Sequence, residues 1–149
     1  MERRKRELCA QEDGLWVELW ALLESLRPEQ IERPGFFPQG WSVKDLMTHI
    51  GCWQAETVQV LEQIRCGTFV RPAVDVDETN RLFREATAGL PLRVVWAELW
   101  ASRTRMLQEW GLLPEVTPDA EEWFFESGPN HYAEHLPRLR EWTAELGAA

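Results

Sequence analysis

Residues 42–67 read SVKDLMTHIGCWQAETVQVLEQIRCG, and this stretch carries the clearest helix boundaries in the chain. Ser42 can cap a helix while Asp45, three residues later, faces back toward the Ser42 amide in a variant of the capping box. Gly67 is placed as the left-handed stop. One helical face collects the apolar residues Leu46, Ile50, Trp53, Val60, Leu61 and Ile64. We therefore predict an amphipathic helix, with His49 at the margin of its apolar face.

The other two histidines of the chain lie four residues apart, in the segment His131-Tyr132-Ala133-Glu134-His135. If residues 129–146 are helical, both imidazoles project from one face, one turn apart, and can reach a single metal ion. Three neutral imidazoles on a divalent cation leave coordination positions free for water or substrate. The pattern thus predicts a catalytic metal site at His49, His131 and His135. The alternative is three unrelated histidines that are hydrogen-bonded in the core.

Apolar residues also recur at three- and four-residue intervals in three other segments, at about 4–26, 91–111 and 129–146. One shorter helix and two helical turns complete the pattern, at about 77–88, 29–32 and 117–125. No convincing pair of strands is present, although a short strand in the connection at 67–76 stays open. We expect an all-α protein of one domain, residues 1–149: an antiparallel four-helix bundle with a long crossover connection and a short extra helix.

Charge and hydropathy limit the kinds of partner that the protein is expected to bind. The net charge is −9, and a surface of that sign repels the phosphates of nucleic acid. No apolar run of about 18 residues could span a membrane, so we expect no membrane partner. The basic residues 3–6 are followed by acidic residues 12–13 before any apolar region, which indicates a charged first turn rather than a signal peptide.

Cysteine usage favours a reducing compartment. Cys9, Cys52 and Cys66 are an odd set, and two of them on one helix, Cys52 and Cys66, would lie about 21 Å apart, too far to form a disulfide. They fit reduced thiols in the cytosol, so we expect a cytoplasmic protein. Cys52, three residues after His49, could be a fourth metal ligand or an inert buried thiol.

Nine tryptophans in a small domain imply large flat walls in the core, some of which can line a pocket. The candidates for the wall of a substrate pocket are Trp41, Trp53, Asn80, Trp123 and Tyr132; plain core packing is the alternative for each tryptophan. In helical projection, Glu134 and Glu56 are the acidic residues best placed to orient an imidazole or to transfer a proton. The alternative for both glutamates is that they are solvated carboxylates on the surface, without a role in the site.

Residues 40–49, GWSVKDLMTH, followed by Gly51 and Trp53, and then residues 131–137, HYAEHLP, resemble the DinB-like superfamily. Its members are bacterial four-helix bundles that include thiol-dependent isomerases and transferases. The resemblance implies that His49, His131 and His135 bind a divalent metal such as nickel, zinc or iron. It also implies a low-molecular-weight thiol as cosubstrate. Gln54 departs from the pattern, because many relatives carry an acidic residue after the tryptophan.

Two protease motifs are excluded. A zincin helix reads HExxH, whereas Tyr132 follows His131 here, so the general base is missing. The segment matches the inverzincin pattern HxxEH. However, Glu141 and Glu145 follow on the same helix, too near in sequence to supply a ligand from a separate element.

Three functions remain open. The first is a metal-dependent enzyme acting on a small molecule, either a thiol S-transferase or isomerase, or a hydrolase, through the open coordination position. The second is a metal-independent protein that binds or detoxifies a small reactive compound. The third is an interaction module, a homodimer whose histidines are structural.

Overall fold

The computed structural model describes residues 2–148, and every regular element within them is an α-helix. The helices are α1 (Glu2–Glu24), α2 (Pro28–Ile31), α3 (Val43–Cys66), α4 (Val76–Thr87), α5 (Leu92–Leu112), α6 (Pro118–Ser127) and α7 (Pro129–Ala148). The predicted all-α class is confirmed, and α1, α3, α5 and α7 are the four long helices. Three shorter helices accompany them rather than one, because the two predicted turns also form helices.

The ends of α3 follow the local chemistry of the sequence. The amide of Ser42 donates to the Asp45 carboxylate at 2.8 Å, and the Asp45 amide donates to the Ser42 hydroxyl at 3.3 Å. Gly67 adopts φ 71°, a left-handed conformation that glycine reaches without steric cost. The predicted capping box and stop are both confirmed, and they fix the register in which His49 leaves the helix.

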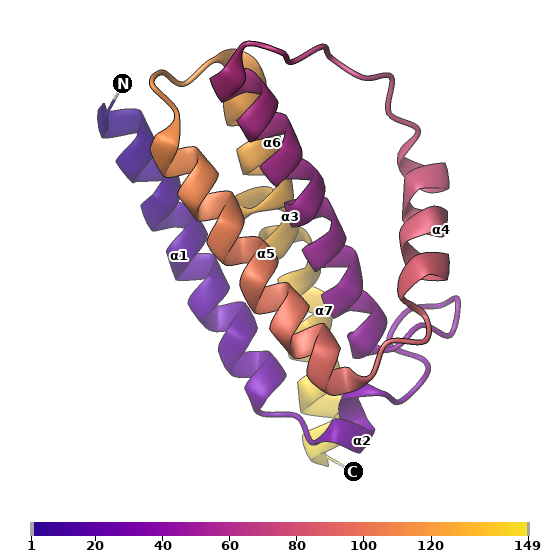
Figure 1. Cartoon of the computed structure of the whole chain (residues 1–149). Helices are drawn as coiled ribbons and strands as arrows, with labels where there is room; N and C mark the ends of the chain where they lie inside the picture. Colours follow the sequence, from indigo (N-terminus) through magenta and orange to yellow (C-terminus); the bar gives the residue numbers. More distant parts are fainter. Residues whose placement is uncertain (1, 149) are drawn as a thin grey trace.

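A long crossover sets the helix directions. Figure 1 shows α3 and α5 running in the same direction, while α1 and α7 run in the opposite one. Residues 68–91, which include α4, connect the end of α3 to the start of α5, and Figure 1 shows α4 on the side of α3 away from α5. The connection before α4 contains no strand among the residues described. No residue of α4 is buried, so this helix covers the bundle rather than joining its core.

The core consists of two apolar clusters with polar side chains between them. On α1 the boundary falls between Leu8, in the smaller cluster, and Trp16, in the larger one. Glu12 lies between them and is fully buried. Gln54 of α3 and Ser102 of α5 are buried at the corresponding level, where the Ser102 hydroxyl donates to the side-chain oxygen Oε1 of Gln54 at 2.9 Å.

The polar layer ties all four long helices together. Arg103 of α5 donates two hydrogen bonds of 2.8 Å to the Glu12 carboxylate of α1. The Tyr132 hydroxyl of α7 donates to the same carboxylate at 2.9 Å and accepts from the Gln54 amide at 2.7 Å. A buried carboxylate requires such partners, because its desolvation is costly unless charge and hydrogen bonds offset it. We name Glu12, Gln54, Ser102, Arg103 and Tyr132 the polar layer.

Gly128 brings the start of α7 close to the rest of the bundle. A Cβ at this position would lie 3.0 Å from the carbonyl oxygen of Phe124 and 3.3 Å from Cγ of Glu12. The missing side chain therefore lets α6 turn directly into α7, three residues before His131. Of the helices described, none is long and apolar enough to cross a membrane.

Candidate metal centre

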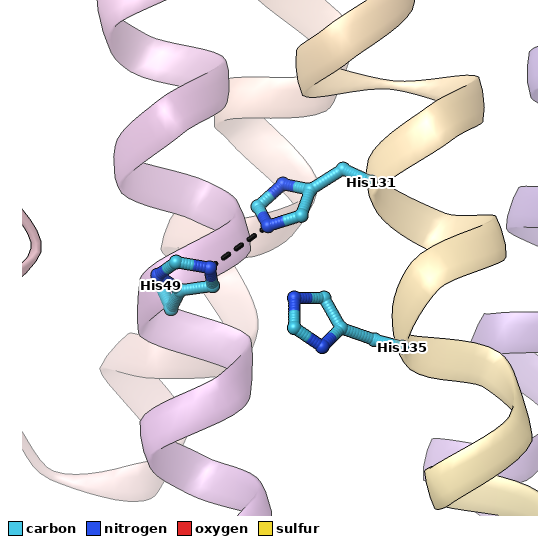
Figure 2. Close-up of side chains that lie close together, drawn as sticks. All are labelled: His49, His131 and His135. Carbon is cyan, nitrogen blue, oxygen red and sulfur yellow. Dashed lines mark hydrogen bonds between the residues drawn. The ribbon is translucent and has the colours of Figure 1, made fainter. Parts of the chain in front are cut away.

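The three histidines meet at one point between α3 and α7. Figure 2 shows the ring of His49 leaving α3 toward the rings of His131 and His135, which project from successive turns of α7. One ring nitrogen of each histidine lies within 4.8 Å of those of the other two. The ring centroids are 4.7 to 5.4 Å apart. Sequence periodicity placed all three on core-facing sides of their helices, and the structure brings them together.

Two of the rings face each other directly. Nε2 of His131 lies 2.8 Å from Nε2 of His49, so one nitrogen carries the proton and the other presents its lone pair. Nδ1 of His131 is buried and has no hydrogen-bond partner within residues 2–148. The orientation of the His131 ring is therefore set by packing and by its two neighbouring imidazoles.

Burial keeps the three imidazoles neutral. It lowers the pKa of His49 to about 4, with a smaller contribution from His135. Burial likewise lowers the pKa of His135 to about 4 and that of His131 well below its ordinary value. All three pKa values are thus below neutrality. Neutral imidazole is the form that binds metal ions.

This donor set fits a divalent transition-metal ion. Three nitrogen ligands from two rigid helices suit zinc, nickel, copper or iron, and fewer protein ligands than coordination positions leave room for another molecule. The unpartnered Nδ1 of His131 departs from the usual arrangement, in which the second nitrogen of a ligand donates to an acceptor. Cys52 is not part of the cluster. Burial, with the charges of Glu56 and Glu98, raises the pKa of its thiol to about 11.

A cavity of about 940 Å³ opens onto the histidines. Four of the expected pocket residues line it with them: Trp41, Trp53, Asn80 and Trp123. The indole N–H of Trp53 donates to the side-chain oxygen Oδ1 of Asn80 at 2.7 Å, and this contact holds α4 against α3 beside the cavity. Glu134 also lines the cavity, next to His135 in sequence.

Two expected site residues lie elsewhere. Tyr132 is fully buried and is not among the residues that line the cavity, because its hydroxyl is directed to Glu12 in the polar layer. The structure therefore places Tyr132 in the polar layer and not at the wall of this cavity. Glu56 is partly buried on α3 and does not line the cavity either. Helical projection alone could not separate these positions from those that face the site.

The departure at Gln54 has a structural reason in this chain. Its side chain is fully buried, and it both donates to Tyr132 and accepts from Ser102. An ionised carboxylate could only accept, so it could not replace the amide here without leaving the Tyr132 contact unmade. Gln54 therefore belongs to the polar layer rather than to the immediate surroundings of the histidines.

Several charged residues of the cavity were missed by the sequence interpretation. They lie mainly on and before α4: Arg71, Asp77, Arg81, Arg84 and Glu85. A signal was present, because Asp77, Asn80, Arg81 and Arg84 are spaced three, four and seven residues apart and share one face of the helix. The sequence did not show that this polar face covers a cavity.

Comparisons with known proteins agree with this architecture. Residues 13–146 match the family model described as the mycothiol maleylpyruvate isomerase N-terminal domain. A crystal structure of an uncharacterised protein from Escherichia coli UTI89 has the same fold, with a TM-score of 0.81 and 18% identity over 96% of this chain and 94% of that one. No curated protein matches the chain significantly. The chain therefore belongs to the family of the mycothiol maleylpyruvate isomerase N-terminal domain, and with it to the DinB-like superfamily that its motifs resemble.

Proposed function

We propose that this protein is a divalent-metal-dependent enzyme that acts on a small molecule in the cavity beside His49, His131 and His135. The observation that carries the proposal is the meeting of three neutral, largely buried imidazoles at the wall of a cavity of about 940 Å³. That volume is in the range of small-molecule sites. An accessible cavity beside the ligands favours a reactive site over a closed structural one.

The proposed reaction is a thiol-dependent transfer or isomerisation. The name of the matched family contains both a thiol, mycothiol, and an isomerase activity, and we extend the use of a low-molecular-weight thiol to this chain. A divalent ion on three imidazoles would supply Lewis acidity and hold a thiol in its reactive thiolate form. Hydrolysis is the other reaction class that such a site allows. The cysteines of the described chain are free, which fits a cytoplasmic enzyme.

Residues that line the cavity are proposed to bind the substrate and to transfer a proton. The indole rings of Trp41, Trp53 and Trp123 give the cavity flat apolar walls that bind carbon skeletons and displace water. Glu134 is assigned the transfer of a proton to or from the substrate, because it lines the cavity on the same helical turn as His135. Glu56 is not assigned this role, since it does not line the cavity.

The test uses full-length protein purified without a histidine tag, stripped of metal and reloaded with zinc, nickel or iron. Turnover is measured with mycothiol and maleylpyruvate, and with other thiols and small electrophiles. We expect activity that needs both ion and thiol, and that falls about 100-fold in Glu134→Gln. Glu56→Gln is the matched control and should retain activity. Turnover that persists in the stripped protein would contradict the metal-dependent reaction.

A second function, metal-independent binding of a small compound, is favoured by one observation. The hydrogen bond between His49 and His131 satisfies both facing nitrogens without an ion. Ligand binding that is equally tight in stripped and metal-loaded protein would support this function over the enzyme.

A further inference from the structure

Three arginines line the cavity, and they differ in whether their donors are hydrogen-bonded. Arg71 and Arg81 each bind two carboxylates, Asp119 and Glu122 in the first case, Glu78 and Glu85 in the second. Arg84 makes no hydrogen bond among the residues described, and its Nε is buried without an acceptor. Buried donors are nearly always paired, so this Nε requires an explanation. The side chain as a whole is 38% exposed, so its other donors can be reached from the cavity.

The nearest carboxylate does not satisfy Arg84. Oδ2 of Asp45 lies 3.7 Å from the Arg84 guanidinium, beyond hydrogen-bond distance. The same oxygen already accepts from the amide of Ser42 at 2.8 Å and from its hydroxyl at 3.1 Å. Asp45 is thus committed to the cap of α3. It lends Arg84 some charge compensation but leaves its donors free.

Arg84 is held in place by an aromatic ring. Its guanidinium carbon lies 4.7 Å above the centroid of Trp41, a cation–π distance. Arg84 and His49 also line a common recess of about 10 Å³ between α3 and α4, besides the main cavity that they share. A guanidinium with unused donors therefore lies on the wall of the same cavity as the histidine cluster.

A planar guanidinium with unused donors is the group that proteins use to bind carboxylates and phosphates in two-pronged fashion. Other residues of the lining limit the size of the anion, because Asp77, Glu126 and Glu134 would repel a polyanion. We propose that Arg84 is the specificity-determining residue of this site, where it binds the carboxylate of a small organic acid whose carbon skeleton lies against the tryptophans. This inference names the substrate class for the proposed function. It rests on the proposed function only for the reaction that the bound acid undergoes.

Binding to metal-free, full-length protein tests the inference without any turnover. The probes are benzoate and its neutral isostere benzamide, with the indole N–H resonance of Trp41 followed by NMR. We expect benzoate to bind about tenfold more tightly than benzamide, because one charge-assisted contact is worth about one decade. The preference should vanish in Arg84→Gln and persist in Arg81→Gln, whose guanidinium is already paired. Arg84→Lys keeps the charge but loses the planar pair of donors, so it should retain part of the preference for benzoate.

An equal preference for benzoate in wild type and Arg84→Gln would overturn the inference, as would the absence of any preference in the wild type. Phenyl phosphate provides a further arm. If it binds more tightly than benzoate and loses that advantage in Arg84→Gln, the assignment to carboxylates is overturned in favour of phosphates. Failure of metal-dependent turnover leaves these results unaffected, because the titrations contain no metal. Failure of the anion preference likewise leaves the metal-dependent reaction standing.

Discussion

The Nε2 atoms of His49 and His131 lie 2.8 Å apart although 82 residues separate them in the chain. Two imidazoles can approach this closely through their nitrogens only when at least one lone pair is available, because two protonated rings would repel each other. The contact therefore joins the second turn of α3 to the start of α7 in a form that requires at least one neutral histidine. Acid should weaken it, and a metal ion should take its place.

Stability of the metal-free protein should fall in mild acid. The pKa values of His49 and His135 are lowered from 6.5 to about 4 in the folded state, so between these values the unfolded chain binds more protons. The free energy of unfolding is therefore fully maintained above pH 6.5 and decreases as the pH falls toward 4. Urea denaturation at several pH values in this window measures the decrease. In the double variant His49→Gln, His135→Gln the slope should be smaller; an unchanged slope would show that these imidazoles titrate alike in both states.

Removal of one partner from the polar layer should destabilise the fold strongly. Glu12→Met removes the buried carboxylate from the largely buried Arg103 guanidinium and leaves it only the exposed Asp13 as a partner, at a cost of about 3 kcal/mol. Tyr132→Phe removes two buried hydrogen bonds, one to Glu12 and one from Gln54, at a cost of about 2 kcal/mol. The double variant Glu12→Met, Arg103→Met should be more stable than Glu12→Met alone, since no buried charge remains unpaired. Denaturant titrations compare the three.

The control for this prediction is Glu78→Gln, which breaks an exposed ion pair with Arg81. It should change stability by less than about 0.5 kcal/mol. If Glu78→Gln lowered the free energy of unfolding as much as Glu12→Met, the burial of Glu12 would add nothing to its contribution to stability.

Gly128 and Gly51 should respond differently to alanine. At Gly128 a Cβ would lie 3.0 Å from the Phe124 carbonyl oxygen, so the backbone must shift, and we expect a loss of about 1 to 3 kcal/mol. At Gly51 the nearest atom, Oγ of Ser102, is 3.5 Å away, an ordinary contact. Gly51→Ala should therefore be tolerated and should benefit from higher helix propensity. Thermal melting of both variants decides; equal melting temperatures would contradict the close approach at Gly128.

Cys52 should behave as an inert thiol. Burial, followed by the charges of Glu56 and Glu98, raises its pKa to about 11, so little thiolate exists at neutral pH. Iodoacetamide should modify exposed Cys66 well before Cys52, as followed by mass spectrometry of peptides. Cys52→Ala should also retain the metal content of the wild type. Rapid labelling of Cys52 would contradict the assignment of an inert thiol. Loss of metal in Cys52→Ala would instead support Cys52 as a fourth ligand.

The boundaries of α3 could be predicted from neighbouring residues, whereas contacts between residues far apart in the sequence could not. Ser42, Asp45 and Gly67 act within one or two helical turns, so their roles could be inferred from spacing. The histidines were placed by the periodicity of their own helices. In contrast, Glu12 pairs with Arg103 and Tyr132, 91 and 120 residues away, and no local pattern identifies such partners. A hint existed, since Glu12 is four residues from both Leu8 and Trp16 and shares their buried face.

The position of α4 could not be predicted for a related reason. None of its residues is buried, and of its apolar side chains Phe83 packs against Trp53 while Leu82 stays exposed, so burial in the core does not dictate where it packs. Individual contacts hold it in place: Asn80 with Trp53, and Arg84 with Trp41. Because these contacts form only after the bundle is assembled, the sequence revealed the helix but not the cavity that it covers.

The central claim is that His49, His131 and His135 bind one divalent ion together. Elemental analysis of full-length protein purified without a histidine tag tests it most directly, with each histidine also replaced singly by alanine. We expect about one ion per chain in the wild type and almost none in any of the three variants, while Cys52→Ala and Glu56→Gln keep the wild-type content. Wild-type protein that takes up no ion when zinc, nickel or iron is supplied, or an ion that survives all three substitutions, would contradict the claim.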